Sequence, residues 1–238
     1  MSYPPPVIDQ TGFNEMQGTS FSQAVTTVQP NALLMFWYVG HGNQLATISS
    51  SPALDWQPPV FMNSNSGAWM YWAFVPTPGT YTISATLAAL DHFKIQWMDV
   101  TGWGTPVTAG YPFGVAQAVG PNAGTGTMSC RVLTTQPNSL VIAYFEQEPE
   151  AVGPVLNTYT PIAPWAWAID NQGLLYSEEE ALLQATFASP VDEVMSILQS
   201  STTDQWQGST IEVFAGPSTS PPPPSPTMIR VKVVAEVS

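Results

Sequence analysis

Cysteine, histidine and basic residues are scarce in this 238-residue sequence. The single cysteine, Cys130, excludes a disulfide within the chain, and the alternating run around it predicts a small residue in a strand. Two histidines and one cysteine are too few ligands for a structural zinc site of the usual kind. Four Lys and Arg residues stand against 17 Asp and Glu residues, which gives a formal charge of -13. Because a polyanion is bound through cations, this balance argues against nucleic acid and anionic membrane surfaces as direct partners.

Charged residues of both signs make up only 9% of the chain, against about 25% in ordinary soluble domains. Ser, Thr, Gln and Asn must therefore cover most of the surface, which is typical of proteins outside cells or inside large assemblies. The start, Met1–Pro6, lacks the basic and apolar regions of a secretory signal peptide. The longest apolar run, Ala32–Val39, is too short to span a bilayer. This combination favours a virion protein that is made in the host cytoplasm and released by lysis; an extracellular location is the alternative.

Sequence signatures of catalysis and of cofactor binding are also missing. Asp91-His92 has no Gly-x-Ser-x-Gly or other activated nucleophile signature with it, which favours a solvated loop pair over a catalytic one. Glu178–Glu180 does not belong to a calcium-binding loop. We therefore expect no enzyme activity, no cofactor, and no catalytic or metal-binding residues.

The sequence does contain an internal repeat. Thr26–Tyr38 returns as Thr134–Phe145, and each copy has a Thr-rich end, a Gln-Pro-Asn turn and a continuous apolar run. Pro and Asn favour turn dihedrals, and an apolar run bounded by turn residues predicts a strand buried on both faces. Fainter similarities follow in the same order and end in stretches around Trp97 and Trp206. The shared order indicates a duplication.

The segment 178–199 fits two interpretations. A capping box and apolar residues at helical spacing suit two short helices. The counterparts in the first copy, 69–74 and 80–87, have clear strand patterns between Pro and Gly residues, so we expect strands in the second copy as well.

Short strands that alternate with Pro- and Gly-rich turns predict an all-β fold, an antiparallel β-sandwich or jelly roll. We expect an N-terminal arm over 1–18 and one sandwich domain over 19–216. Within that domain the pseudo-repeats cover about 19–103 and 125–215.

The C-terminus consists of a Pro-rich linker, 217–227, and a predicted strand, 228–238. One face of this strand is apolar and is formed by Ile229, Val231, Val233, Ala235 and Val237. A strand carried on a linker needs a sheet edge, either in its own domain or in a neighbour through β-augmentation. Because polyproline forms a stiff, extended spacer, we favour the neighbour and interpret the segment as an assembly strand.

Four tryptophans lie in turn-rich segments: Trp56, Trp103, Trp165 and Trp167. Exposed aromatic side chains on loops stack on sugars or anchor a protein partner, because Trp is enriched at binding hot spots. The alternative is that these side chains plug the ends of the sandwich, where each buries a large apolar area.

Several loose motifs are familiar from one family of β-sandwiches. They are Ser20-Phe21-Ser22, the apolar strand after Pro30-Asn31, Trp72-Ala73-Phe74-Val75-Pro76 with Gly79-Thr80-Tyr81-Thr82-Ile83, Asp99-Val100-Thr101-Gly102 with Thr105-Pro106-Val107, and Ser139-Leu140-Val141-Ile142. Through them, residues from about 19 to 216 resemble a jelly-roll-like family of bacteriophage virion proteins and bacterial extracellular, adhesin-like proteins. The resemblance implies a virion decoration, a fibre or tail module, or an adhesin-like domain, and no shared catalytic residues. The chain departs from the pattern by having Trp103 in the turn and few Gly in its strands.

Together these observations lead to one hypothesis and its alternatives. We expect a non-enzymatic structural protein of a phage virion, a capsid decoration or head-surface protein. Its expected partners are other copies of itself and a major capsid or tail protein. The alternatives are a tail or fibre component, and a carbohydrate-binding adhesin module in which the loop tryptophans bind glycans.

Overall fold

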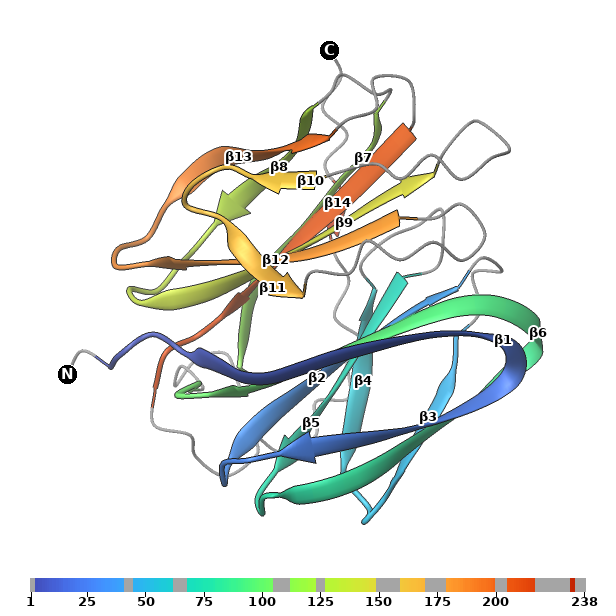
Figure 1. Ribbon diagram of the computed structural model, residues 1–238. Helices are drawn as coiled ribbons and strands as arrows, with labels where there is room; N and C mark the ends of the chain where they lie inside the picture. Colours follow the sequence, from blue (N-terminus) through green and yellow to red (C-terminus); the bar gives the residue numbers. More distant parts are fainter. Residues whose placement is uncertain are drawn as a thin grey trace.

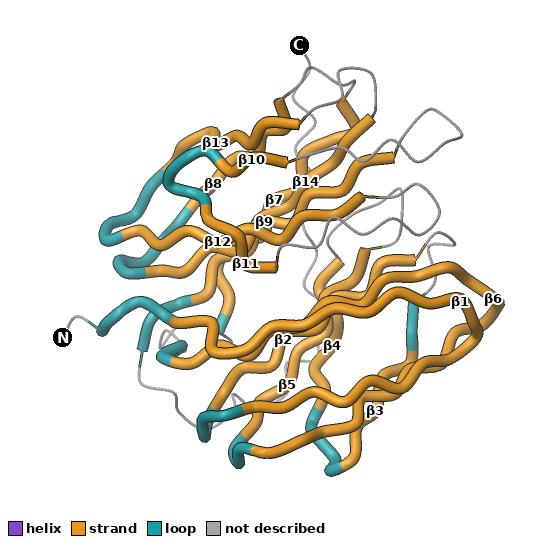
Figure 2. Tube along the Cα trace, in the orientation of Figure 1, coloured by secondary structure: helices purple, strands orange, loops and turns teal. Residues whose placement is uncertain are grey.

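The computed structural model describes residues 3–40, 45–61, 68–104, 112–122, 127–148, 159–169, 179–199, 205–216 and 232–233. These residues form β-strands joined by turns and contain no helix (Figures 1 and 2), which confirms the predicted all-β class. The strands are β1 (Val7–Thr27), β2 (Ala32–Gly40), β3 (Thr47–Ser51), β4 (Trp56–Phe61), β5 (Ala68–Val75), β6 (Gly79–Thr101), β7 (Phe113–Asn122), β8 (Thr127–Leu133), β9 (Ser139–Glu148), β10 (Tyr159–Pro161), β11 (Ala166–Ile169), β12 (Glu179–Phe187), β13 (Asp192–Gln199), β14 (Gln205–Val213) and β15 (Lys232–Val233). No membrane-spanning helix is found among the described residues.

The two halves of the chain repeat one pairing scheme. In the first half the strand order is β1-β6-β2-β5-β4, and β3 pairs with β6. In the second half one sheet has the order β11-β12-β9-β14-β7-β15, and a second has the order β10-β13-β8. Strands β1 and β6 of the first half are long and bent (Figure 1). Strand β1 corresponds to β7 and β8 together in the second half, and β6 corresponds to β13 and β14 together. The described halves therefore have the same topology, as the repeat in the sequence indicated.

Equivalent turns fix the two halves in the same register. The backbone dihedral φ is 60° at Asn31 and 61° at Asn138, and Asn adopts this left-handed conformation more readily than most residues. Two residues after each Asn, Leu33 pairs with Val100 and Leu140 pairs with Val213. The stretches around Trp97 and Trp206 lie in equivalent strands, the second part of β6 and β14, as the repeat indicated. Counted back from Val100 and Val213, the residue equivalent to Trp97 is Thr210, so the two tryptophans do not share a position.

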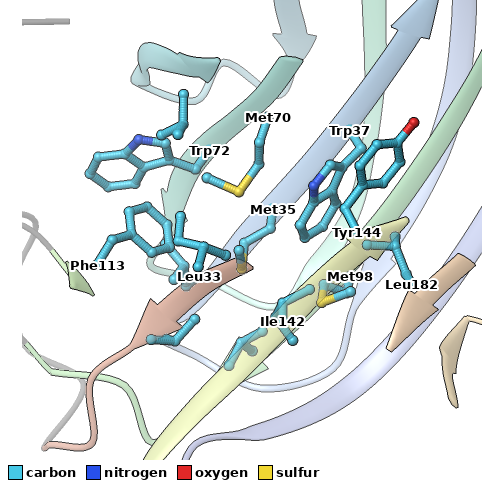
Figure 3. Close-up of a cluster of buried hydrophobic side chains, with 14 of the residues drawn as sticks. Leu33, Met35, Trp37, Met70, Trp72, Met98, Phe113, Ile142, Tyr144 and Leu182 are labelled. Carbon is cyan, nitrogen blue, oxygen red and sulfur yellow. The ribbon is translucent and has the colours of Figure 1, made fainter. Parts of the chain in front are cut away.

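The main core lies between the two large sheets, which face each other. Alternate residues of β2 and β5 meet alternate residues of β9, β12 and β14 there, and Figure 3 shows Leu33, Met35, Trp37, Met70, Trp72, Met98, Phe113, Ile142, Tyr144 and Leu182. The other side chains of β2 and β5 form a second core with the bent parts of β1 and β6, and those of β9 and β12 form a third with β8. Strands β2 and β9 are thus covered on both faces, which explains their continuous apolar runs.

The structure confirms one of the segment interpretations given above and corrects two. Residues 7–18, which we expected to form an arm, belong to β1 and pair with β6 from Thr101 to Asp91. Residues 179–187 and 192–199 are strands, as the repeat indicated. Lys232 and Val233 pair in parallel with Gln117 and Ala118 of the same chain. This pair returns to its own domain, contrary to the neighbouring edge that we favoured.

The halves also meet through backbone at the ends of β6 and β14. Trp103 forms an isolated antiparallel bridge with Ala215. The Gly104 N–H donates to the Phe214 carbonyl at 2.8 Å, and the Gly216 N–H donates to the Gly102 carbonyl at 2.9 Å. The backbones cross so closely that a Cβ on Gly104 would lie 2.6 Å from Gly216 Cα. Two glycines therefore allow this crossing.

Candidate functional site

The structure buries two of the four tryptophans that we considered as ligand or partner contacts. Trp103 is fully buried, and its indole N–H donates to the Asn31 carbonyl at 2.9 Å. Trp165 packs into the third core. Trp56 packs against the second core and donates to Ser50 Oγ at 3.2 Å. The side chain of Trp167 lies outside the described part of the structure. Trp103 and Trp165 therefore plug the interior, and neither presents a ring to a ligand at the surface.

The C-terminal candidates are described only in part. Val233 lies in β15, next to β7. Ile229, Val231, Ala235 and Val237 lie outside the described residues.

The Asp91-His92 pair does not form the solvated loop that we expected. Asp91 is buried on β6 and accepts a hydrogen bond from Tyr38 Oη at 3.0 Å. Burial and the nearby Asp91 carboxylate raise the pKa of Tyr38, so this phenol stays protonated and donates. The side chain of His92 lies outside the described residues.

Two buried carboxylates occupy equivalent positions under the two Gln-Pro-Asn turns. Glu212 accepts hydrogen bonds from the Thr135 N–H at 2.8 Å, the Gln136 N–H at 3.1 Å and Ser139 Oγ at 2.6 Å. Asp99 holds the same place in the first half, one residue before Val100. Burial raises the pKa of Asp99 to about 6, and nearby backbone N–H groups of Gln10 and Val28 oppose part of that rise. Glu212 thus stabilises its turn through hydrogen bonds, whereas both carboxylate oxygens of Asp99 are buried without a hydrogen-bond partner among the described residues.

Cys130 is buried in β8, as the alternating pattern predicted. Burial raises the pKa of its thiol, which disfavours the reactive thiolate. Among the described residues, no group of three or more His, Cys, Asp and Glu side chains gathers in a way that could hold a metal ion.

One pocket of about 390 Å³ opens in the first half, where β3 connects to β4 and β5 connects to β6. Its described walls are Pro52, Ala53, Leu54, Asp55, Gln57, Trp72, Phe74, Pro76 and Tyr81. Aromatic rings and prolines dominate the lining, and Asp55 is the one charged side chain among these nine. An apolar, preformed concavity with few polar groups is the usual form of a binding site.

The pocket owes one wall to a difference between the halves. Ile48 and Pro161 lie at equivalent positions of their ladders, and so do Gln57 and Ala166. The connection from Ile48 to Gln57 is four residues longer than the one from Pro161 to Ala166. The pocket residues Pro52 to Asp55 lie in this longer connection. The pocket was not predicted from the sequence, although an alignment of the two repeats across their β3 and β10 segments would have revealed the additional residues.

The Tyr81 hydroxyl and the Gln57 amide of the pocket are held by the chain itself, whereas the buried indole N–H of Trp72 has no hydrogen-bond partner in the described part of the chain. Tyr81 Oη donates to the Thr77 carbonyl at 2.6 Å. Gln57 Nε2 donates to the Asp55 carbonyl at 3.2 Å and to Asp55 Oδ2 at 3.1 Å. The rings of Trp72 and Phe113 pack in a T-shaped arrangement, with their centroids 5.2 Å apart. These contacts fix the side chains in place before any ligand arrives.

A second candidate surface is the outer face of the bent part of the first half, where β6 lies between β1 and β3. The outward residues are Ser20, Ser22, Ala24, Thr26, Thr47, Ser49, Ser51, Thr80, Thr82, Ser84 and Thr86. We call this set the hydroxyl face. None of its members is charged. Two cross-strand pairs of hydroxyl groups are hydrogen-bonded, Thr26 with Thr80 at 3.0 Å and Ser84 with Ser22 at 3.4 Å.

The equivalent face of the second half has a different chemistry. It carries an ion pair between Arg131 Nε and Asp192 Oδ1 at 2.6 Å, and exposed Val194 and Leu198 side chains. The hydroxyl face is therefore specific to the first half.

No family model, curated protein or solved structure matches this chain.

Proposed function

We propose that the protein is a non-enzymatic structural component of a phage virion, which decorates the head surface by packing on copies of itself and on the capsid protein. The observation that carries this proposal is the hydroxyl face: a regular, uncharged sheet surface on a chain with a formal charge of -13.

The electrostatic argument is simple. Two copies of so acidic a chain repel each other wherever carboxylates meet, since like charges brought together at an interface cost several kcal/mol. A face without carboxylates avoids this cost. Its short Ser, Thr and Ala side chains also lose less rotamer freedom on contact than Lys, Glu or Gln would.

We assign the self-association contact to the hydroxyl face rather than to strand β15, because Lys232 and Val233 pair with β7 of their own chain. The tail or fibre alternative uses the same physical argument and differs only in location. The adhesin alternative depended on tryptophans of which Trp103 and Trp165 are buried.

Immunogold labelling of intact virions with antibodies against the protein tests the location. We expect gold particles on the head. Label confined to the tail would assign the protein to a tail or fibre, and unlabelled virions would contradict a virion role.

The hydroxyl face is tested with Thr82→Glu, which places a carboxylate at its centre. The matched control is Thr186→Glu, at an exposed position of β12. We expect Thr82→Glu to weaken self-association about tenfold or more, which is about 1.4 kcal/mol, in light scattering over a concentration series. Equal association of the two variants would show that the hydroxyl face is not the contact.

A further inference from the structure

The pocket between the β3–β4 and β5–β6 connections is suited to an occupant that is apolar, rigid and weakly hydrogen-bonding. Trp72, Phe74 and Tyr81 supply aromatic walls, and Pro52 and Pro76 supply flat apolar ones. A sugar would need several hydrogen-bond partners, whereas the Tyr81 hydroxyl and the Gln57 amide already donate within the chain. Proline rings meet the requirement, since a polyproline II segment docks on aromatic-lined grooves and is already ordered before it binds.

The chain itself contains such a segment. Ser220-Pro221-Pro222-Pro223-Pro224-Ser225-Pro226 follows Gly216, the last described residue of the sandwich, and Arg230 and Lys232 come soon after it. These two residues are half of the four cations of the chain. The described cations of the sandwich, Lys94 and Arg131, have carboxylate partners in Glu15 and Asp192. Lys232 pairs with β7 of its own chain, so Arg230 is the cation downstream of the prolines that complements Asp55 at the pocket.

The length of the segment also suits a contact between molecules. Residues 217–231 connect Gly216 to β15, which pairs with β7 of its own chain, so the segment is a connection held at both ends. Its ten residues 217–226 extend about 31 Å in the polyproline II conformation at about 3.1 Å per residue, so a connection of this length has room to present its prolines to another molecule. We propose that the pocket binds the proline-rich segment, residues 217–226, of a second copy of this chain. The choice of a second copy as the source of the segment rests on the self-assembly proposed above. The match between the pocket and a proline-rich segment does not depend on that function.

The test measures binding of a fluorescent peptide of residues 216–230 by anisotropy. The receptor is the full-length chain in which Pro221, Pro222, Pro223 and Pro224 are replaced by Ser, so that its own segment does not compete. A peptide with the same four Pro→Ser changes is the control ligand. We expect saturable binding of the native peptide and at least tenfold weaker binding of the control.

A second test fills the pocket with a larger side chain at an exposed lining residue, because replacing a buried lining residue could disturb the fold. Ala53 lines the pocket and is exposed, so Ala53→Trp fills the space without removing a buried contact. Ala188→Trp, at an exposed turn of the second half, adds the same indole elsewhere. We expect Ala53→Trp to weaken peptide binding at least tenfold and Ala188→Trp to leave it unchanged.

The opposite results overturn the proposal. The absence of saturable binding, or equal binding by the two Trp variants, removes the proline segment as the occupant. Retention of an oligosaccharide, blocked by Ala53→Trp, in place of the peptide would make the pocket a sugar site. Peptide binding by the wild-type chain is measured over a range of protein concentrations that includes those at which the chain is monomeric. If the wild-type chain fails to bind the peptide at all of them, the segment occupies the pocket of its own chain, and the proposed binding to a second copy is wrong.

These outcomes are separate from the test of the hydroxyl face. Thr82→Glu lies outside the pocket lining, and a receptor with this change should bind the peptide normally. If Thr82→Glu weakens self-association but leaves peptide binding intact, the result supports the hydroxyl face and leaves the pocket proposal unaffected. If the peptide does not bind although virions are labelled, the result overturns the proline segment as the occupant and leaves the virion function unaffected.

Discussion

At the scale of single residues, the buried carboxylates of Glu212 and Asp99 occupy equivalent positions in the two halves but differ in their hydrogen bonding. Glu212 reaches the backbone N–H groups of its turn and satisfies them at hydrogen-bonding distance. The shorter side chain of Asp99 occupies the same ladder position. Its carboxyl group is buried, which disfavours the charged form and raises its pKa to about 6 from 3.8.

Asp99 therefore makes stability depend on pH. Because its folded-state pKa is raised, its contribution is most favourable below pH 4 and declines as the pH rises from about 4 to 6, by up to about 3 kcal/mol. We expect Asp99→Asn to flatten the free energy of unfolding between pH 4 and pH 7, measured by urea titration at each pH. An unchanged slope would contradict the raised pKa.

The control for this measurement is Asp192→Asn. Arg131 lowers the pKa of the exposed Asp192 carboxyl, so its effect is present above pH 4 and lost as the pH falls below that value. This substitution should leave the slope between pH 4 and pH 7 as it is in the wild-type chain.

At the scale of elements, the crossing of Gly104 and Gly216 joins the two halves. A Cβ on Gly104 would lie 2.6 Å from Gly216 Cα and 3.1 Å from the Ala215 carbonyl oxygen, and both contacts are with backbone. The backbone must shift to accept the methyl group, and such overpacking typically costs about 1–3 kcal/mol. We expect Gly104→Ala to lower the free energy of unfolding by that amount in urea titration.

Gly79→Ala is the matched comparison, because a Cβ there meets nothing within 4 Å. It should change the free energy of unfolding much less than Gly104→Ala. If both substitutions cost the same, the close crossing is not what distinguishes Gly104.

The elements that the sequence predicted correctly are those in which local and tertiary requirements agree. The apolar runs of β2 and β9 are buried on both faces, and the Asn of each preceding turn has a positive φ. Strands β12 and β13 were assigned through their first-half counterparts, since their own apolar spacing also suits helices.

The errors have a common physical cause. Residues 7–18 are rich in Gln, Asn and Gly, and what makes them a strand is their pairing with Asp91–Thr101, far along the chain. Trp103 and Trp165 lie in turn-rich segments, yet their indoles reach back into cores formed by distant strands. A local pattern cannot report a partner tens of residues away. The pocket was missed for the same reason, because Trp72, Phe74 and Tyr81 gain a common cavity only through the longer connection after β3.

At the scale of the whole molecule, the main core belongs to neither half alone. Leu33, Met35 and Trp37 of β2 are fully buried against residues of the second half such as Ile142 and Tyr144. An isolated half would expose this apolar sheet face to water, at a cost of about 25 cal/mol for each Å² uncovered. The duplication thus produced two units that share one core.

Each half should therefore fail to fold alone although its topology is complete. We expect separately expressed fragments 1–106 and 107–238 to be aggregated or to lack the fixed near-ultraviolet circular dichroism of packed tryptophans, and coexpressed fragments to copurify as a soluble pair. The pair should unfold in one transition when followed by tryptophan fluorescence and by far-ultraviolet circular dichroism, because the shared core couples the halves. A soluble, cooperatively unfolding fragment on its own would show that the second or third core suffices, and that the two large sheets join as independent domains.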